Sequence, residues 1–212
     1  MLIIFDLDGT LVQSNILYST IKSELKDLLK SIIGEELYSE FVSIPRSILE
    51  ILTFISKHDN SGFYSKKAWE IVEKYEIKGY EHATIHDDVL PTLKILKEKG
   101  ATIAILTNNS KKLTDFAMKQ FNLNKYIDYV VTRDDVEKVK PDPEGIYKIM
   151  KKFNKDKEET LFIGDSWLDA ESAFNAGVKF AYFGKANEET REKKIPAKIE
   201  INSISEVLNL SF

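Results

Sequence analysis

Short apolar segments alternate with helical segments after residue 90, and this alternation constrains the fold more than any other feature of the sequence. Short apolar runs between turn residues are typical of buried strands, and apolar residues three or four positions apart are typical of helices. Repeated strand–helix units predict an α/β fold, with a doubly wound, Rossmann-like parallel sheet covered by helices on both faces. The predicted strands are 2–5, 101–106, 127–131, 161–164 and 178–182, and the predicted helices are 91–99, 112–121, 143–153, 168–176 and 205–210.

The segment between the first strand and this repeat is of a different kind. Residues 15–85 show helical spacing and no strand signal. Pro45 suits the first position of one helix, because proline has no N–H to leave unpaired there. The predicted helices of this segment are 16–33, 35–42, one that begins at Pro45, and 65–77. We therefore expect two domains: a Rossmann-like core of residues 1–14 and 86–212, and a small α-helical domain of residues 15–85.

Polar side chains follow the predicted strands at the points where the strands end. In open parallel sheets, ligands bind beyond the carboxyl ends of the strands, so these side chains are expected to share one edge. Carboxylates hold a hard cation, and hydroxyl, amide and ammonium groups bind phosphate oxygens. A spare carboxylate can also be a nucleophile that forms an aspartyl phosphate. The residues at this edge are Asp6, Asp8, Thr107, Asn108, Lys140, Asp165 and Asp169.

The end of the first strand carries Asp6 and Asp8, followed by Gly9 and Thr10. Two carboxylates at the end of a buried strand are costly unless their charge is compensated, and a divalent cation such as magnesium suits that task. Gly9 allows a sharp turn and the close approach of a ligand, and the N–H groups of this turn could cradle an anion. The alternative, from these residues alone, is a solvated Asp-rich turn.

Composition restricts the partners and the chemistry. The net charge is -4, hydrophobic residues make up 43% of the chain, and there is no cysteine. A mildly acidic chain is not expected to bind nucleic acid or an acidic membrane. Without cysteine, disulfides, thiol catalysis and cysteine–zinc sites are excluded. No apolar run has the length of a membrane span, and the start lacks the features of a signal peptide. We expect a cytoplasmic protein that is a monomer or a homodimer.

Four short motifs, in order along the chain, resemble those of the haloacid dehalogenase (HAD) superfamily. FDLDGTLV is similar to the first motif, ILTNN to the second, KVKPDPE to the third and GDSWLDAESAFNAG to the fourth. The chain looks most like the phosphatase branch that carries a helical cap of the C1 type, and it is phosphoglycolate-phosphatase-like. The resemblance implies a magnesium-dependent phosphatase that hydrolyses a small phosphorylated metabolite.

The resemblance also implies the catalytic roles. Asp6 is the nucleophile, which forms an aspartyl phosphate. Asp8 is the general acid for the leaving alkoxide and then the general base for water. Because a halide leaves without a proton, the carboxylate of Asp8 argues against dehalogenation.

The same resemblance implies how the metal and the phosphoryl group are held. Mg²⁺ is bound by Asp6, by Asp165 and by the backbone carbonyl of Asp8, and Asp169 supports that site. The phosphoryl oxygens are held by Thr107, Asn108 and Lys140, next to the turn of Gly9 and Thr10.

The helical insert corresponds in this resemblance to a mobile cap, which closes over the active site and selects the substrate. Arg46 stands near the start of a predicted cap helix and is a candidate to bind a second anionic group of the substrate. The alternative for Arg46 is a surface arginine in a first turn.

Two other functions stay open. A sugar phosphomutase of the same superfamily would use the same core, although no extra cap signature for it is evident. A non-enzymatic receiver, which accepts a phosphoryl group, also combines acids, threonine and lysine on a doubly wound sheet. Receivers carry their acceptor aspartate after the third strand and have no helical insert. A long-lived phosphoprotein would favour the receiver, and turnover would favour the enzyme.

Overall fold

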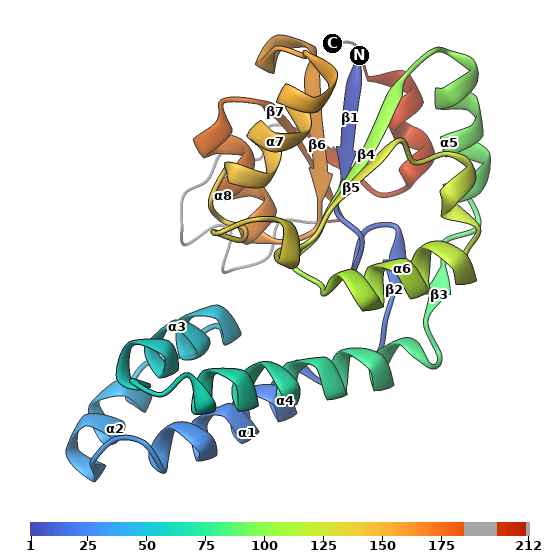
Figure 1. The fold of residues 1–212 in the computed structure, drawn as a ribbon. Coiled ribbons are helices and arrows are strands. Elements are labelled where there is room, and N and C mark those ends of the chain that lie inside the picture. Colours follow the sequence, from blue (N-terminus) through green and yellow to red (C-terminus); the bar gives the residue numbers. More distant parts are fainter. Residues whose placement is uncertain (185–198, 211–212) are drawn as a thin grey trace. The chain divides into compact units, whose positions relative to one another are not determined.

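The chain separates into two compact units in the computed structural model, which describes residues 1–184 and 199–210 (Figure 1). One unit comprises Met1–Ser14 and Ala83–Phe212, and the other comprises Asn15–His82. The second unit is shorter than the expected insert, 15–85. The difference arises because strand β3 (Thr84–Ile85) pairs in antiparallel fashion with strand β2 (Val12–Gln13), which places both strands in the first unit.

The main sheet of the first unit has six parallel strands in the order β5-β4-β1-β6-β7-β8. Its central strand, β1, lies between β4 and β6, with Phe5 paired to Ile105 on one side and to Ile163 on the other. The parallel α/β sheet predicted from the strand–helix alternation is therefore confirmed. The strands are β1 (Leu2–Phe5), β4 (Thr102–Leu106), β5 (Tyr129–Val131), β6 (Thr160–Gly164), β7 (Lys179–Phe183) and β8 (Glu200–Ile201).

Helices cover the two faces of this sheet (Figure 1). On one face, Leu2 and Ile4 of β1 pack in a single apolar cluster with Ile146 of α7 and Ala170 of α8. On the other face, α5 contacts β4 and the short 3-10 helix η4. The helices are α5 (Val89–Glu98), α6 (Lys111–Gln120), α7 (Glu144–Phe153) and α8 (Trp167–Ala176), with 3-10 helices η1 (Leu123–Lys125), η2 (Arg133–Asp135), η3 (Lys157–Glu159) and η4 (Ile204–Asn209).

Complete burial of the central strand gives the unit its core. All four residues of β1 have no exposed surface. Burial of one such large aliphatic side chain contributes roughly 1.5–3 kcal/mol relative to exposure. The core therefore fixes the direction of β1 and the point at which its carboxyl end emerges.

The second unit is entirely helical in its regular structure. Its core contains Ile21 and Leu25 of α1 together with Ile51 and Ile55 of α3. The helices are α1 (Tyr18–Lys30), α2 (Glu35–Val42), α3 (Ile48–His58) and α4 (Phe63–Tyr80).

The start of α3 differs from the expected one. The helix begins at Ile48, so the prediction that Pro45 takes its first position is wrong. Ser47 caps the helix instead, because its hydroxyl accepts a hydrogen bond from the backbone N–H of Glu50 and the Glu50 carboxylate accepts one from the N–H of Ser47. This reciprocal capping box satisfies two N–H groups that would otherwise lack partners at the helix start.

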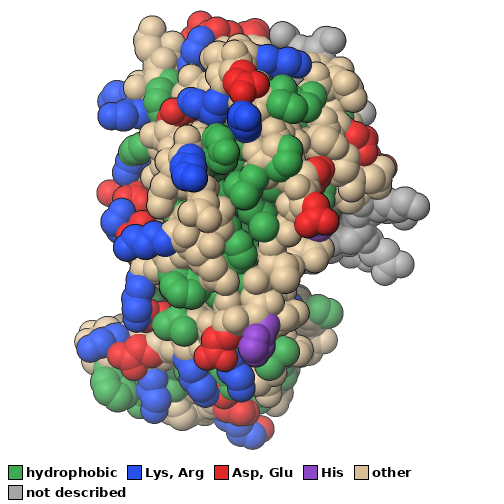
Figure 2. All heavy atoms as spheres, turned by 90° about the vertical axis from the view of Figure 1, so that its right-hand side faces the viewer, with side chains coloured by type: hydrophobic (Ala, Val, Ile, Leu, Met, Phe, Trp, Pro, Cys, Tyr) green, Lys and Arg blue, Asp and Glu red, His purple; other side chains and the backbone are tan. Residues whose placement is uncertain are grey.

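On the face drawn in Figure 2, Lys and Arg side chains are interspersed with Asp and Glu side chains. Such mixing agrees with the small net charge of -4. Among the residues that the structure describes, no helix is both long enough and apolar enough to span a membrane.

Candidate active site

The carboxyl ends of three neighbouring strands bring the candidate residues together. Asp6 follows β1 directly, and its backbone N–H donates a hydrogen bond of 2.8 Å to the carbonyl of Ile163 in β6. Thr107 follows β4, and its N–H donates 3.0 Å to the carbonyl of Val131 in β5. Asp165 follows β6. Because the strands are parallel and in register, the residues that follow them share one edge of the sheet, as predicted.

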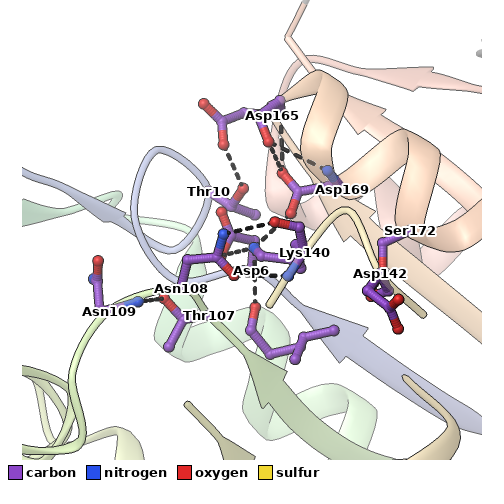
Figure 3. Close-up of polar contacts among 12 residues, drawn as sticks. Asp6, Thr10, Thr107, Asn108, Asn109, Lys140, Asp142, Asp165, Asp169 and Ser172 are labelled. Carbon is purple, nitrogen blue, oxygen red and sulfur yellow. Dashed lines mark hydrogen bonds and ion pairs between the residues drawn. The ribbon is translucent and has the colours of Figure 1, made fainter. Parts of the chain in front are cut away.

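Lys140 reaches this edge from the loop between β5 and α7, and its side chain is 4% exposed. Its Nζ donates to Oδ1 of Asp6 at 2.8 Å, to Oδ1 of Asp169 at 2.6 Å and to the backbone carbonyl of Leu106 at 3.3 Å (Figure 3). An ammonium group has three N–H donors, and each has an acceptor here. Lys140 therefore joins the ends of β1 and β4 to helix α8.

Asp6 is buried and Asp165 is partly buried, and both lie among like charges. Burial raises the pKa of Asp6 well above its ordinary value, and the carboxylates of Asp169 and Asp165 raise it further against the opposing effect of Lys140. Burial also raises the pKa of Asp165 to about 7, with repulsion by Asp169 as the second cause and a further contribution from Asp8. A single ammonium group therefore does not balance the negative charge at this edge.

The pKa of Lys140 shifts in the opposite sense. Burial alone would lower the pKa of its ammonium group, but the Asp169 and Asp6 carboxylates raise the pKa above its ordinary value. Lys140 is therefore a permanent cation at neutral pH, and it offsets the charge of one carboxylate.

Gly9 and Thr10 lie against Asp165. The φ angle of Gly9 is +85°, and a Cβ atom at this position would lie 2.3 Å from Oδ2 of Asp165. The Thr10 hydroxyl donates to Oδ1 of the same carboxylate at 3.3 Å. Glycine is therefore required here twice, for its backbone conformation and for the space that the Asp165 carboxylate occupies.

Asp169 is fully buried and is held by the start of α8. Its Oδ2 accepts hydrogen bonds from the hydroxyl of Ser166 and, at 3.1 Å, from the backbone N–H of Ser166. Its side chain approaches β6 so closely that a Cβ atom on Gly164 would lie 2.5 Å from the Asp169 Cβ. The two oxygens of Asp169 are thus shared between Ser166 and Lys140.

These carboxylates have the composition of a magnesium site. One oxygen each from Asp6, Asp165 and Asp169 lies within 4.8 Å of the others. Magnesium prefers oxygen ligands and is bound in proteins through a small number of carboxylates. A divalent cation here would relieve the repulsion that raises the pKa of Asp6 and Asp165. The donor set and its charge therefore fit the cation that the sequence predicts.

Thr107 and Asn108 stand side by side after β4, but their side chains have different partners. The buried hydroxyl of Thr107 accepts a hydrogen bond of 3.1 Å from the backbone N–H of Asn109 and retains its own O–H donor. The side-chain amide of Asn108 is bonded at both ends to the backbone of Lys140. A substrate contact was expected for the Asn108 side chain, and in this structure its amide nitrogen and its amide oxygen each form a hydrogen bond with the Lys140 backbone.

Asp8 and Arg46 complete the predicted set. Asp8 lies in the turn after β1, forms a bridge with Val12, and is near enough to Asp165 to raise the pKa of that carboxyl. Arg46 belongs to the helical unit. Its guanidinium group lies 5.0 Å from the ring centroid of Phe41 and forms an ion pair of 3.5 Å with Glu50.

Sequence reasoning missed residues that hold the site in place. Ser166 caps α8 and binds Asp169, and the spacing Ser-x-x-Asp is a capping signal that could have identified it. Arg133 donates from its NH1 to the backbone carbonyl of Asn108 at 3.3 Å, and Ser172 donates from its hydroxyl to the carbonyl of Asp142 at 3.1 Å. These two contacts join loops and a helix that are distant in sequence, so no local pattern indicates them.

The amino-acid sequence is similar to those of known proteins. The haloacid dehalogenase-like hydrolase family matches residues 3–183 of the chain. A pyrophosphatase PpaX from Halalkalibacterium halodurans is 34% identical over an alignment of 196 residues, which covers 87% of this chain and 83% of that protein.

Solved structures support the same fold. One described as a haloacid dehalogenase-like hydrolase from Bacteroides fragilis has a TM-score of 0.73 and 23% identity, and it covers 97% of this chain and 98% of its own. One described as a predicted phosphoglycolate phosphatase from Haemophilus somnus has a TM-score of 0.70 and 23% identity, with coverage of 98% and 96%.

The family match and the fold place the chain in the HAD superfamily of hydrolytic enzymes. The chain belongs to the haloacid dehalogenase-like hydrolase family. The resemblance drawn from the four sequence motifs is thereby confirmed, together with the prediction of a hydrolytic enzyme.

Proposed function

We propose that this protein is a magnesium-dependent phosphatase that hydrolyses a small phosphorylated metabolite through an aspartyl phosphate on Asp6. The observation that carries the proposal is the position of the Asp6 carboxylate. It lies at the end of the central strand, is 6% exposed, accepts a hydrogen bond of 2.8 Å from Lys140, and is close to Asp165 and Asp169. A carboxylate held at one oxygen by a buried cation has a fixed orientation, which favours attack on a bound phosphoryl group.

Asp6 and Asp8 carry the two steps of the proposed reaction. In the first, a carboxylate oxygen of Asp6 bonds to phosphorus, the bond from phosphorus to the leaving oxygen breaks, and Asp8 gives that oxygen a proton. In the second, a water oxygen bonds to phosphorus, its proton passes to the Asp8 carboxylate, and the bond between Asp6 and phosphorus breaks. Inorganic phosphate leaves, and both aspartates return to their starting states.

Other residues at this edge have supporting roles in the proposal. Thr107 and the backbone N–H groups of Asp8 and Thr10 would hold the phosphoryl oxygens. The N–H of Gly9 between them donates instead to the carbonyl of Val12 at 2.8 Å. Lys140 would orient Asp6, since its three N–H donors are bonded to Asp6, Asp169 and the carbonyl of Leu106.

Magnesium is the metal that we propose for the carboxylates. Asp6, Asp165 and the backbone carbonyl of Asp8 are the proposed ligands, and Asp169 supports the site through Lys140 and Ser166. When bound, Mg²⁺ supplies positive charge that balances the carboxylates and the phosphoryl oxygens. We favour magnesium over softer metals because the donors are all oxygen atoms.

Two substrate classes fit this site. The motif resemblance favours a phosphate monoester such as phosphoglycolate, whereas the name of the 34% identical relative from Halalkalibacterium halodurans favours inorganic pyrophosphate. The classes differ in the leaving group. An alkoxide is strongly basic and requires a proton from Asp8, but a phosphate leaving group is much less basic and requires it less.

We propose that the helical unit, Asn15–His82, acts as the cap domain and selects the substrate. Arg46 is the candidate residue in that unit for a second anionic group. Its guanidinium group has five N–H donors, so it retains donors besides those that face the Phe41 carbonyl and Glu50.

The proposal is tested by phosphate release from a panel of substrates with and without Mg²⁺. The panel contains phosphoglycolate, sugar phosphates, pyrophosphate and p-nitrophenyl phosphate, and each substrate is assayed with the wild-type protein and with Asp6→Asn. We expect turnover of at least one substrate by the wild type and only background release by Asp6→Asn. Wild-type turnover rates in purified Asp6→Asn would refute Asp6 as the nucleophile.

A further inference from the structure

The side-chain amide of Asn108 forms two hydrogen bonds with a single residue that lies 32 positions away in the chain. Its Nδ2 donates to the backbone carbonyl of Lys140 at 3.0 Å, and its Oδ1 accepts from the backbone N–H of Lys140 at 3.0 Å (Figure 3). Both backbone groups of Lys140 are therefore satisfied by one planar amide. Such a pair fixes the Lys140 backbone in position and in orientation.

Asn108 is itself held from its backbone side. The NH1 group of Arg133 donates to the Asn108 carbonyl at 3.3 Å, and the N–H of Arg133 donates to the carbonyl of Asn109 at 3.2 Å. Arg133 of η2 thus holds the backbone of the loop after β4, and Asn108 in that loop holds Lys140.

The loop that contains Lys140 depends on such side-chain contacts. Lys140 lies between η2 and α7, outside every helix and strand of the described chain. The Glu144 carboxylate accepts from the N–H groups of Glu137 and Lys138 at 2.9 and 3.0 Å, and Ser172 binds the carbonyl of Asp142. Asn108 is the residue in this set that contacts Lys140 directly.

We infer that Asn108 is a positioning residue, which places Lys140 and through it the Asp6 carboxylate, and that its side chain does not bind the substrate. The inference rests on the proposed function, because it takes Lys140 and Asp6 to act in the reaction. A displaced Lys140 would leave the buried Asp6 and Asp169 carboxylates without their shared donor. Misplacement of a reacting group by about 1 Å can cost about 100-fold in rate.

The chemistry of the contact requires asparagine. An ionised aspartate has the same shape but only accepts hydrogen bonds, so it would keep the bond from the Lys140 N–H and lose the bond to the Lys140 carbonyl. Alanine would lose both bonds. Asn108→Asp therefore removes one hydrogen bond without a change of side-chain volume, whereas Asn108→Ala removes both hydrogen bonds and reduces the volume.

The experiment compares kcat and KM of the wild type, Asn108→Ala, Asn108→Asp and Lys140→Ala, with Asn175→Ala as a matched control. Asn175 also donates from its amide to this loop, to the carbonyl of Pro141, but at 3.4 Å and from an exposed position. Thermal unfolding of each variant shows which are folded at the assay temperature. If Asn108→Ala does not fold, kcat and KM of the isosteric Asn108→Asp are compared with those of the wild type instead.

We expect kcat of both Asn108 variants to fall about 10–100-fold while KM stays within about threefold. Asn175→Ala should match the wild type in both constants. A rise in KM with unchanged kcat would overturn the inference and return Asn108 to a substrate contact. Wild-type kcat in Asn108→Ala or in Asn108→Asp would also overturn it.

Lys140→Ala separates failure of the inference from failure of the proposed function. If Lys140→Ala is as active as the wild type, the proposed role of Lys140 fails and the inference fails with it. If Lys140→Ala is inactive while both Asn108 variants keep wild-type constants, only the inference fails.

Discussion

Lys140 and Asp6 lie 134 positions apart in the sequence and form a buried ion pair of 2.8 Å. The same ammonium group binds Asp169 at 2.6 Å, so one cation serves two carboxylates and Asp165 lies close to both. Removal of one partner from a buried charged pair leaves an uncompensated charge. One ammonium group is thus the counter-charge for three nearby carboxylates, Asp6, Asp165 and Asp169. This shortage of positive charge is the physical basis for the first prediction.

Mg²⁺ should bind at this cluster and stabilise the folded protein. Because the cation relieves repulsion among Asp6, Asp165 and Asp169, we expect it to raise the midpoint of thermal unfolding, and EDTA to reverse the shift and abolish hydrolysis. Asp165→Asn should weaken the magnesium response in the unfolding assay. Full hydrolysis in metal-free protein, or an equal magnesium shift in Asp165→Asn, would contradict this assignment.

Loss of Asp8 should affect substrates according to their leaving groups. Asp8→Asn keeps the proposed nucleophile but has no proton to give, so we expect kcat/KM for an alkyl phosphate, which reports the first step, to fall roughly 10²–10⁴-fold. The loss should be smaller for p-nitrophenyl phosphate, whose leaving group is weakly basic. Values of kcat/KM for both substrates test this, because they do not depend on hydrolysis of the shared aspartyl phosphate, and equal losses on the two would argue that Asp8 acts in another way than proton donation to the leaving group.

Gly9→Ala should disturb the metal site beyond its effect on folding. A Cβ atom there would lie 2.3 Å from the Asp165 carboxylate, whereas a Cβ atom on Gly100, whose φ is also positive at +78°, would meet nothing within 4 Å. Both variants should lose about 1–2 kcal/mol of stability from the left-handed backbone. Activity should fall in Gly9→Ala and stay near wild type in Gly100→Ala, measured at saturating Mg²⁺. Equal activities in the two variants would show that the contact with Asp165 is unimportant.

Arg46→Ala should lower kcat/KM for a substrate with a second anionic group. Loss of one charged hydrogen bond corresponds to roughly 1.5–3 kcal/mol, or about 10–150-fold. Turnover of p-nitrophenyl phosphate, which has no second anion, should hardly change. Equal losses on both substrates would assign Arg46 to the fold of the helical unit, where it contacts Phe41 and Glu50. No loss on either substrate would leave it as a surface arginine.

The sequence predicted the sheet edge because its signals are local. A buried strand followed by Asp6 and Asp8 is visible in a short segment, and so is Asp165 after β6. Strands β2 and β8 are too short for a hydrophobic pattern to reveal them. The start of α3 depended on the Ser47 cap, which outweighed Pro45 as a start signal.

The partners of the polar side chains were less accessible to sequence reasoning. Asn108 was expected to contact the substrate, but its amide binds the Lys140 backbone. That contact depends on how two loops pack, and composition and spacing carry no information about it. The same holds for the three acceptors of the Lys140 ammonium group.

The most direct test of the account is to trap the covalent intermediate on Asp6. Asp8→Asn lacks the base that activates water, so we expect a phosphoryl group to accumulate on the protein after mixing with Mg²⁺ and p-nitrophenyl phosphate. Mass spectrometry of the acid-quenched protein, followed by peptide mapping, should place that group on Asp6, and Asp6→Asn/Asp8→Asn should carry none. A phosphoryl group on another residue, or turnover in the wild type with no Asp6-linked phosphate in either protein under single-turnover conditions, would contradict Asp6 as the nucleophile.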